Sequence, residues 1–182
     1  MRRRGWWTFP RGRGPGDPLR PPKERGLHLE LLTDEELFPV CSPRLLERGH
    51  RFAHPSDLAG QTLLHFEGRA DDRDFPGWNQ WLSVAGVAGL EVVNGPRFSM
   101  SSMVLQAAMD GQGIALGSSV LAADDLRAGR LVRLFETSVR AKHNYYLICT
   151  RNTFNRPDIQ RFVRWIKAEM GGDRDESPDR RG

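Results

Sequence analysis

The last third of the chain carries the clearest hydrophobic pattern. Residues 156–170, RPDIQRFVRWIKAEM, place Ile159, Phe162, Val163 and Ile166 on one helical face, with Arg and Lys opposite. Residues 78–86, WNQWLSVAG, repeat apolar side chains at helical spacing and end at a glycine, which predicts another helix. A further helix is predicted in SSVLAADDLRAG, at residues 118–129.

Short apolar and β-branched runs between these helices predict strands. They occupy residues 36–42 (ELFPVCS), 62–66, 89–98, 130–136 and 144–150. Pro39 has no amide hydrogen to give to a neighbouring strand, so the first run is expected at a sheet edge or at a crossover. Because strands and helices alternate, the pattern predicts an α/β fold with a mainly parallel sheet.

Residues 99–117, SMSSMVLQAAMDGQGIALG, join a serine cluster to a helix and a short apolar strand. Ser99 is expected to cap a helix that begins near Met100. Gly111 fits the left-handed position that follows a helix end, and Gly113 permits close backbone approach where the strand enters the sheet.

The serine cluster is the candidate binding site. In open α/β sheets, ligands bind near the carboxyl ends of strands and the N-termini of helices. Free amide groups and the positive end of the helix dipole favour a carboxylate or a phosphate there. The candidates are Ser99, Ser101 and Ser102. The alternative interpretation is that one serine caps the helix and the others are merely polar.

Charge is distributed unevenly along the chain. The 182 residues carry a net charge of +4, of which residues 1–25 contribute +6 and the remainder −2. Residues 1–25 are rich in Arg, Gly and Pro and are expected to be disordered, as is the mixed-charge tail at 171–182. The nearly neutral body gives no electrostatic basis for binding nucleic acid. Trp6, Trp7 and Phe9 among the first arginines leave single-stranded nucleic-acid binding as an alternative function.

Other chemical signals are sparse. Cys41 and Cys149 show no CxxC spacing and are interpreted as reduced thiols. The chain has no run of about 18 apolar residues and no leader-like apolar segment, so we expect a cytoplasmic protein without membrane contact. No P-loop, HExxH or GxSxG motif occurs, so neither an enzyme nor a cofactor is expected. Glu35 and Glu36 are interpreted as a solvated turn.

Six segments occur in an order found in a known family: FPVCSPRLL, DLAGQTLLHF, WNQWLSVAGV, FSMSSMVLQAAMDGQGIALG, LRAGRLVRLFE and FVRWIKAEM. Over about residues 27–170 the chain resembles the effector-binding domain of LysR-type transcriptional regulators. It is most similar to the subgroup of the glycine-cleavage activator and the β-lactamase regulators. No single one of these motifs is specific to the family, but the occurrence of all six in this order is.

The resemblance implies a periplasmic-binding-protein-like (type 2) fold of two lobes joined by crossover strands. The second lobe is expected to be complete at residues 39–136. The first lobe is expected to be partial, formed by residues 26–38 and by a return segment at 137–170. A small effector, anionic or amino-acid-like, would bind between the lobes and control transcription in the complete protein.

The resemblance also implies effector contacts. The hydroxyls at the start of the helix would face the cleft, together with Phe66 on the preceding strand. Tyr145 on the returning strand matches a tyrosine that faces the ligand in the β-lactamase regulators. Tyr146 replaces it if the register shifts by one residue, because a one-residue slip reverses the two faces of a strand.

The family also has a winged helix-turn-helix and a fuller first lobe that this sequence does not show. DNA contact is therefore expected only through a domain absent from this chain, and the expected partner is a second copy or a full-length regulator. Alternatives are a non-functional or dominantly interfering fragment, a solute-binding module, and an enzyme with Cys41 as nucleophile. Strand 145–149 and the last helix would expose apolar surface, which predicts marginal stability, dimerisation or aggregation.

Overall fold

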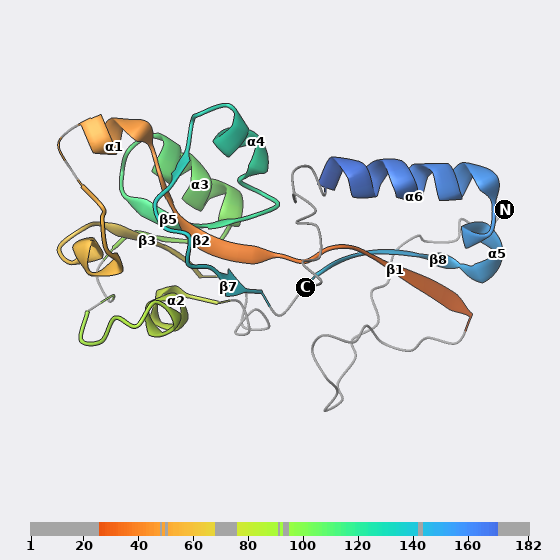
Figure 1. Cartoon of the computed structure of the whole chain (residues 1–182), viewed down its shortest axis with the longest axis horizontal. Coiled ribbons are helices and arrows are strands. Elements are labelled where there is room, and N and C mark those ends of the chain that lie inside the picture. Colours follow the sequence, from red (N-terminus) through yellow and green to blue (C-terminus); the bar gives the residue numbers. More distant parts are fainter. Residues whose placement is uncertain are drawn as a thin grey trace, which may run out of the picture.

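The chain forms two bodies that lie side by side along its long axis (Figure 1). The computed structural model describes residues 26–47, 49, 51–67, 76–90, 92, 95–141 and 144–170. The predicted disorder of residues 1–25 and 171–182 concerns segments outside these ranges. The domain bounds at 26–38, 39–136 and 137–170 stay a prediction.

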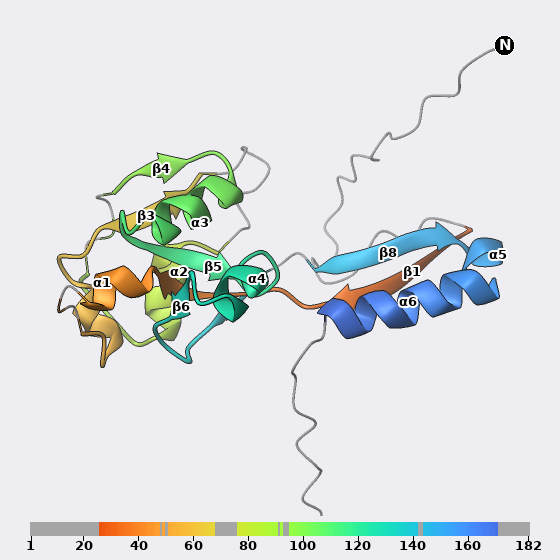
Figure 2. The same ribbon diagram turned by 90° about the horizontal axis from the view of Figure 1, so that it is seen from above.

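The smaller body is a two-stranded antiparallel sheet covered by a helix (Figure 2). Leu27 lies opposite Thr150, and the register shifts between Leu31 and Thr33. The sheet thus joins the first and last described strands of the chain. Its elements are β1 (Leu27–Thr33), β8 (Tyr145–Thr150), α5 (Arg151–Phe154) and α6 (Pro157–Met170).

Helix α6 confirms the predicted closing helix but buries a different set of side chains. Val163 is buried, and Ile159 and Ile166 are half-buried. Phe162 was expected on the same face, yet it is 46% exposed and lies beside Trp165, which is 55% exposed. The two ring centroids are 5.7 Å apart. α6 therefore carries an aromatic pair facing solvent, at the i, i+3 spacing that brings side chains together.

The larger body is a six-stranded sheet in the order β4-β3-β5-β2-β6, with β7 also paired to β2. Helix α3 lies above this sheet and α2 below it in the view of Figure 1. Its elements are β2 (Glu36–Cys41), α1 (Pro43–Glu47), η1 (Pro55–Leu58), β3 (Leu63–Phe66), α2 (Trp78–Val84), β4 (Arg97–Phe98), α3 (Ser101–Met109), β5 (Ile114–Ser118), α4 (Ala123–Arg127), β6 (Val132–Arg133) and β7 (Val139–Arg140).

The expectation of a mainly parallel sheet is wrong. β3 runs parallel to β4 and to β5, but β2 is antiparallel to β5, β6 and β7. β2 enters this sheet from the other body, which sets its direction against β3 and β5. Alternation of helices and strands along a sequence does not determine whether two neighbouring strands run parallel or antiparallel.

Pro39 sits inside β2 rather than on a sheet edge. It lies opposite Leu116 of β5. On the other side of β2, β7 pairs with Glu36 and Leu37 whereas β6 pairs with Val40 and Cys41. Pro39 falls in the gap between these two short partners, where only its carbonyl is used, by the Leu134 amide at 3.0 Å. The edge expectation is wrong, and the crossover alternative fits a strand that follows β1 directly into a second sheet.

Three predicted elements are shorter than their sequence patterns. Of residues 89–98, only Arg97 and Phe98 form a strand among those described. The helix expected at 118–129 is reduced to Ala123–Arg127, because residues 119–121 form a turn. The strand expected at 130–136 pairs only at Val132–Arg133.

Two apolar clusters fill the larger body, one against each face of the sheet. Trp78 and Trp81 of α2 anchor the first cluster, and Val104, Leu105 and Ala108 of α3 belong to the second. The indole of Trp78 donates to the Leu64 carbonyl and that of Trp81 to the Thr137 carbonyl, each at 3.0 Å. Both tryptophans thus satisfy their polar atom while buried, as a stable core requires.

Candidate functional site

A small recess of about 10 Å³, room for about one water molecule, lies at the carboxyl ends of β3 and β5, next to the start of α3. Because these two strands are parallel, their ends meet at one edge of the sheet. The sequence predicted this kind of place for the ligand. The recess is lined by Phe66, Ser101, Val104, Leu105, Leu116, Ser118 and Leu121.

The start of α3 is not capped by a side chain. Met100 occupies the N-cap position in extended conformation and makes no side-chain cap hydrogen bond. The expectation that Ser99 caps this helix is therefore wrong. The helix begins at Ser101, which places that serine on the first turn, half-buried at the rim of the recess. The positive end of the α3 dipole consequently faces this edge of the sheet.

Two glycines fix how α3 leads into β5, as predicted. Gly111 follows the helix with a φ of +75°, a left-handed conformation that side chains rarely adopt. A Cβ on Gly113 would lie 2.4 Å from the Thr62 carbonyl oxygen. β5 can therefore lie close beside β3 only with glycine at this position, and this closeness brings their two ends together.

The hydroxyl of Ser118, at the end of β5, is fully used by the protein. It donates a hydrogen bond to the Glu35 carboxylate. It accepts hydrogen bonds from the amides of Val120 and Leu121, each at 3.2 Å. A serine hydroxyl has one hydrogen and two lone pairs, so these three bonds complete its capacity. Ser118 therefore shapes the recess and holds Glu35.

Glu35 and Tyr145 come together where the chain passes between the bodies. Glu35 directly precedes β2 and is only 5% exposed. Tyr145 opens β8 and is half-buried. Burial raises the pKa of the Tyr145 phenol, and the negative charge of Glu35 raises it further. The candidate site thus combines the end of β5 with the two segments, at Glu35 and at Tyr145, where the chain passes from one body to the other.

The structure brings together some of the predicted site residues and not others. Phe66 and Ser101 line the recess. The negative charge of Glu35 acts on the phenol of Tyr145. Glu35 in turn accepts a hydrogen bond from Ser118, which lines the recess. Ser99 and Ser102 are exposed and are not among the lining residues.

Glu35 was missed by sequence reasoning. Glu35 and Glu36 were interpreted as a solvated turn, and that interpretation is wrong, because Glu35 is buried and Glu36 is half-buried in β2. Ser118 was expected at the start of a helix but ends β5. An available signal was the apolar run after Glu36, which indicated that the acidic segment leads straight into a buried strand.

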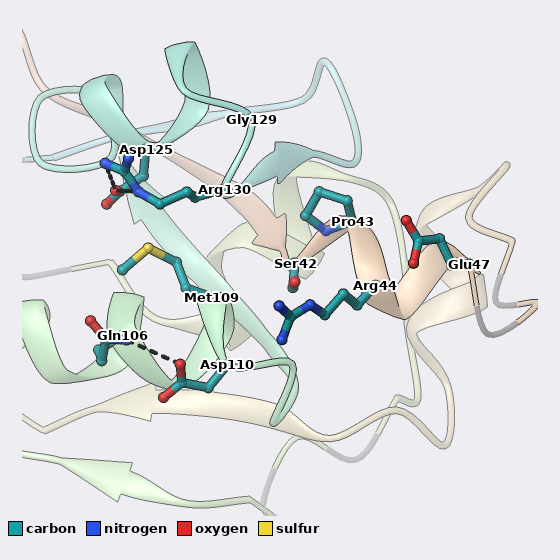
Figure 3. A pocket seen from close by; sticks show the side chains of 10 residues that line it. All are labelled: Ser42, Pro43, Arg44, Glu47, Gln106, Met109, Asp110, Asp125, Gly129 and Arg130. Atoms are coloured by element: carbon teal, nitrogen blue, oxygen red, sulfur yellow. Dashed lines mark hydrogen bonds and ion pairs between the residues drawn. The ribbon is translucent and has the colours of Figure 1, made fainter.

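A larger hollow of about 680 Å³ lies elsewhere on the same body, between α1, the end of α3 and α4 (Figure 3). Two polar pairs lie in its walls. Arg130 binds Asp125 through its Nε at 2.7 Å, and the Gln106 amide donates to Asp110 at 3.1 Å. None of the predicted site residues lines it.

Within the part of the chain that the structure describes, no group of three or more His, Cys, Asp or Glu could hold a metal ion. In the same ranges, no helix is both long enough and apolar enough to cross a bilayer. Cys41 is buried, and burial raises the pKa of its thiol to about 11. At neutral pH this buried thiol is therefore almost entirely protonated, and the thiol form is a poor nucleophile.

Comparison with known proteins identifies a family and several curated relatives that match this chain. A profile of the family described as the LysR substrate binding domain matches residues 18–171. The chain is 39% identical over 150 residues to the glycine cleavage system transcriptional activator of Escherichia coli strain K12, covering 82% of this chain and 47% of that protein. It is 31% identical over 139 residues to the HTH-type transcriptional activator AmpR of Citrobacter koseri, covering 76% and 45%.

Solved effector domains of transcriptional regulators have a fold similar to that of this chain. The effector domain of the transcriptional regulator AmpR of Pseudomonas aeruginosa matches with a TM-score of 0.57 and 26% identity, over 82% of this chain and 68% of that one. The AmpR effector binding domain from Citrobacter freundii, at 22% identity, has the same fold with a TM-score of 0.59. The chain spans about half the length of the curated relatives that it matches.

Proposed function

Since this chain belongs to the LysR substrate-binding domain family, we propose that it binds a small effector at the recess between the ends of β3 and β5. Its fold is the type 2 periplasmic-binding-protein-like fold of that family, as predicted. The observation that carries the proposal is the meeting of two parallel strand ends with an uncapped helix start.

The proposed effector is a small anionic or amino-acid-like compound. Ser101 offers a hydroxyl on the first turn of α3, and the helix dipole favours a negative group there by roughly 0.3–1 kcal/mol. Phe66 would provide apolar contact on one side, and Tyr145 on the returning strand is the predicted contact from the other body. We retain Ser99 and Ser102 as predicted contacts that the experiment below compares with Ser101.

In this proposal the chain is the regulatory part of a cytoplasmic transcription factor. DNA contact would come from segments that the curated relatives have and this match does not cover. The partner is a second copy or a full-length regulator of the same family. A fragment that pairs with such a regulator would interfere with it, and the exposed aromatic pair on α6 favours such pairing. Nucleic-acid binding by residues 1–25 stays a prediction.

The proposal is tested by thermal unfolding of the full chain with a library of organic acids, amino acids and sugar phosphates. We expect at least one compound to raise the melting temperature by several degrees. Ser101→Ala should then weaken its binding five- to tenfold, more than Ser99→Ala or Ser102→Ala. Ser83→Ala, an exposed serine on α2, is the matched control and should bind normally. If no compound stabilises the protein at millimolar concentration, the proposed function is contradicted.

A further inference from the structure

Ser42 is a buried polar side chain that its own protein leaves unsatisfied. Among the described residues, the buried polar or charged side chains are those of Glu35, Ser42 and Ser118, with exposed fractions of 5%, 3% and 4%. Glu35 and Ser118 bind each other. Within the same ranges, the Ser42 hydroxyl forms no hydrogen bond, and the Leu45 amide binds the backbone carbonyl of Ser42 at 3.0 Å instead. Buried hydroxyls nearly always have a partner, so this one calls for a ligand.

The Ser42 hydroxyl opens onto the hollow of about 680 Å³ between α1, the end of α3 and α4. Figure 3 shows it pointing into this hollow. Ser42 follows the last residue of β2, and β2 runs antiparallel to β5. The hollow therefore lies at the edge of the sheet opposite to the recess at the end of β5. The two are separate places on the larger body.

Arg44 brings an uncompensated positive charge to the same hollow. Glu47 lies three positions later on α1, a spacing at which opposite charges commonly pair. Within the described part of the chain, however, Arg44 forms no ion pair. Figure 3 shows its guanidinium directed into the hollow and away from Glu47. The other guanidinium of the wall, that of Arg130, is bound by Asp125 at 2.7 Å. Arg44 is thus the cation that a ligand would meet.

Asp110 limits which anion fits beside Arg44. Its Oδ1 accepts a hydrogen bond from the Gln106 amide at 3.1 Å. Its Oδ2 has no such partner within the described residues, so it can still accept hydrogen bonds. A bare anion would meet the repulsion of this carboxylate. An anion that also carries hydroxyl groups would bind Arg44 with its charge and donate a hydroxyl hydrogen to Asp110.

We propose that this hollow binds a small hydroxylated organic anion, a sugar phosphate or a sugar acid. The Arg44 guanidinium and the Ser42 hydroxyl would bind the phosphate or the carboxylate, and Asp110 would accept from a hydroxyl of the sugar. A guanidinium matches the geometry of both anions. The volume of about 680 Å³ lies in the range of roughly 300–1,000 Å³ that small-molecule pockets occupy. This site does not depend on the effector function proposed for the recess.

The experiment measures binding to the full chain by titration calorimetry with four probes: D-glucose 6-phosphate, D-gluconate, inorganic phosphate and D-glucose. Low ionic strength is kept constant, because salt screens contacts between charges. We expect glucose 6-phosphate, gluconate or both to bind at millimolar concentration, and their comparison tells which oxyanion is preferred. Inorganic phosphate should bind about tenfold more weakly, since it lacks the hydroxyl groups for a charged acceptor. Glucose should not bind.

Arg44→Gln is the first variant. It removes the charge and should weaken binding of the anion about tenfold, as loss of a hydrogen bond between charged groups does. Arg127→Gln is the matched control. It lowers the net charge by the same amount from the exposed side of α4 and does not line the hollow, so it should bind normally. Ser101→Ala, at the recess, should also bind normally.

Ser42→Ala separates a ligand contact from a structural one. Because the hydroxyl has no partner in the free protein, its removal should leave the melting temperature unchanged or raise it. The same change should weaken binding of the anion about fivefold, the effect of one ordinary hydrogen bond. A lower melting temperature with unchanged affinity would show that the hydroxyl supports the fold, and the role of Ser42 would be rejected.

The results distinguish this site from the effector site. An anion whose affinity falls with Arg44→Gln but not with Ser101→Ala supports the hollow, whether or not any compound binds at the recess. Equal affinities of Arg44→Gln and Arg127→Gln would overturn the proposal, as would binding of glucose as tight as that of the anions. Failure of both glucose 6-phosphate and gluconate to bind at millimolar concentration would overturn it as well.

Discussion

The ammonium group of Lys167, near the end of α6, donates a hydrogen bond to the carboxylate of Glu30 on β1, 137 positions earlier in the chain. The His28 ring lies 3.1 Å from the same carboxylate. This contact fastens the last helix to the first strand of the smaller body. The Lys167 hydrogen bond, and after it the contact with His28, holds the pKa of Glu30 below its usual value of 4.5.

Acid should weaken this attachment. A carboxyl whose folded pKa is depressed stabilises the protein above its unfolded pKa, and that contribution disappears as the pH falls through the folded pKa. We expect urea unfolding to show a loss of stability below about pH 4.5. Lys167→Gln should show a smaller loss, because an ion pair of this kind is worth about 0.2–1 kcal/mol. Arg164→Gln, on the exposed side of α6, is the control; a pH profile for Lys167→Gln identical to that of the control would contradict the expectation.

The two cysteines should differ sharply in reactivity. Cys41 is fully buried in β2 with a pKa of about 11, whereas Cys149 of β8 is half-buried. Modification by a disulfide reagent at pH 8 requires the thiolate and access to it. We expect one thiol per chain to react in the folded protein and two in urea. Cys149→Ala should abolish the fast phase, and a fast phase that survives this change would show that the core around Cys41 opens readily.

Tyr145 offers a direct probe of the Glu35 charge. The chain has two tyrosines, so Tyr146→Phe leaves Tyr145 as the single phenol. We expect its ultraviolet titration to have a midpoint above 10, because burial and then the Glu35 charge both oppose phenolate formation. Adding Glu35→Gln should lower the midpoint while leaving it above 10. An unchanged midpoint would mean that Glu35 does not act on Tyr145.

The aromatic pair on α6 should promote self-association. Phe162 and Trp165 are both largely exposed, and exposed apolar surface of this kind favours contact between molecules. We expect light scattering at tens of micromolar to detect dimers or larger species. Phe162→Ser combined with Trp165→Glu should shift the population toward monomer. Arg161→Glu changes charge on the same exposed side without removing an aromatic ring, and a monomeric unaltered protein would contradict the prediction.

Local patterns predicted the elements whose formation depends on local spacing. Helices α2, α3 and α6 follow from apolar periodicity, and Gly111 and Gly113 were assigned correctly from helix-end and backbone geometry. The apolar run after Glu36 indicated that Glu35 borders a buried strand, but its contacts come from β5 and from the returning segment, both far away in sequence. Phe162 fits the pattern of a buried face, but the small sheet covers only the side of α6 that carries Val163.

The pairing of β1 with β8 constrains how the protein is made. β1 leaves the ribosome before any part of the larger body, yet its partner strand β8 is synthesised only after the whole of that body. At about 5–20 residues per second, β1 waits on the order of ten seconds with its hydrogen-bonding edge open. The larger body can close around β2 during that interval. The smaller sheet therefore cannot form before β8 is made, and a chaperone that shields extended segments could bind residues 27–33 during that interval.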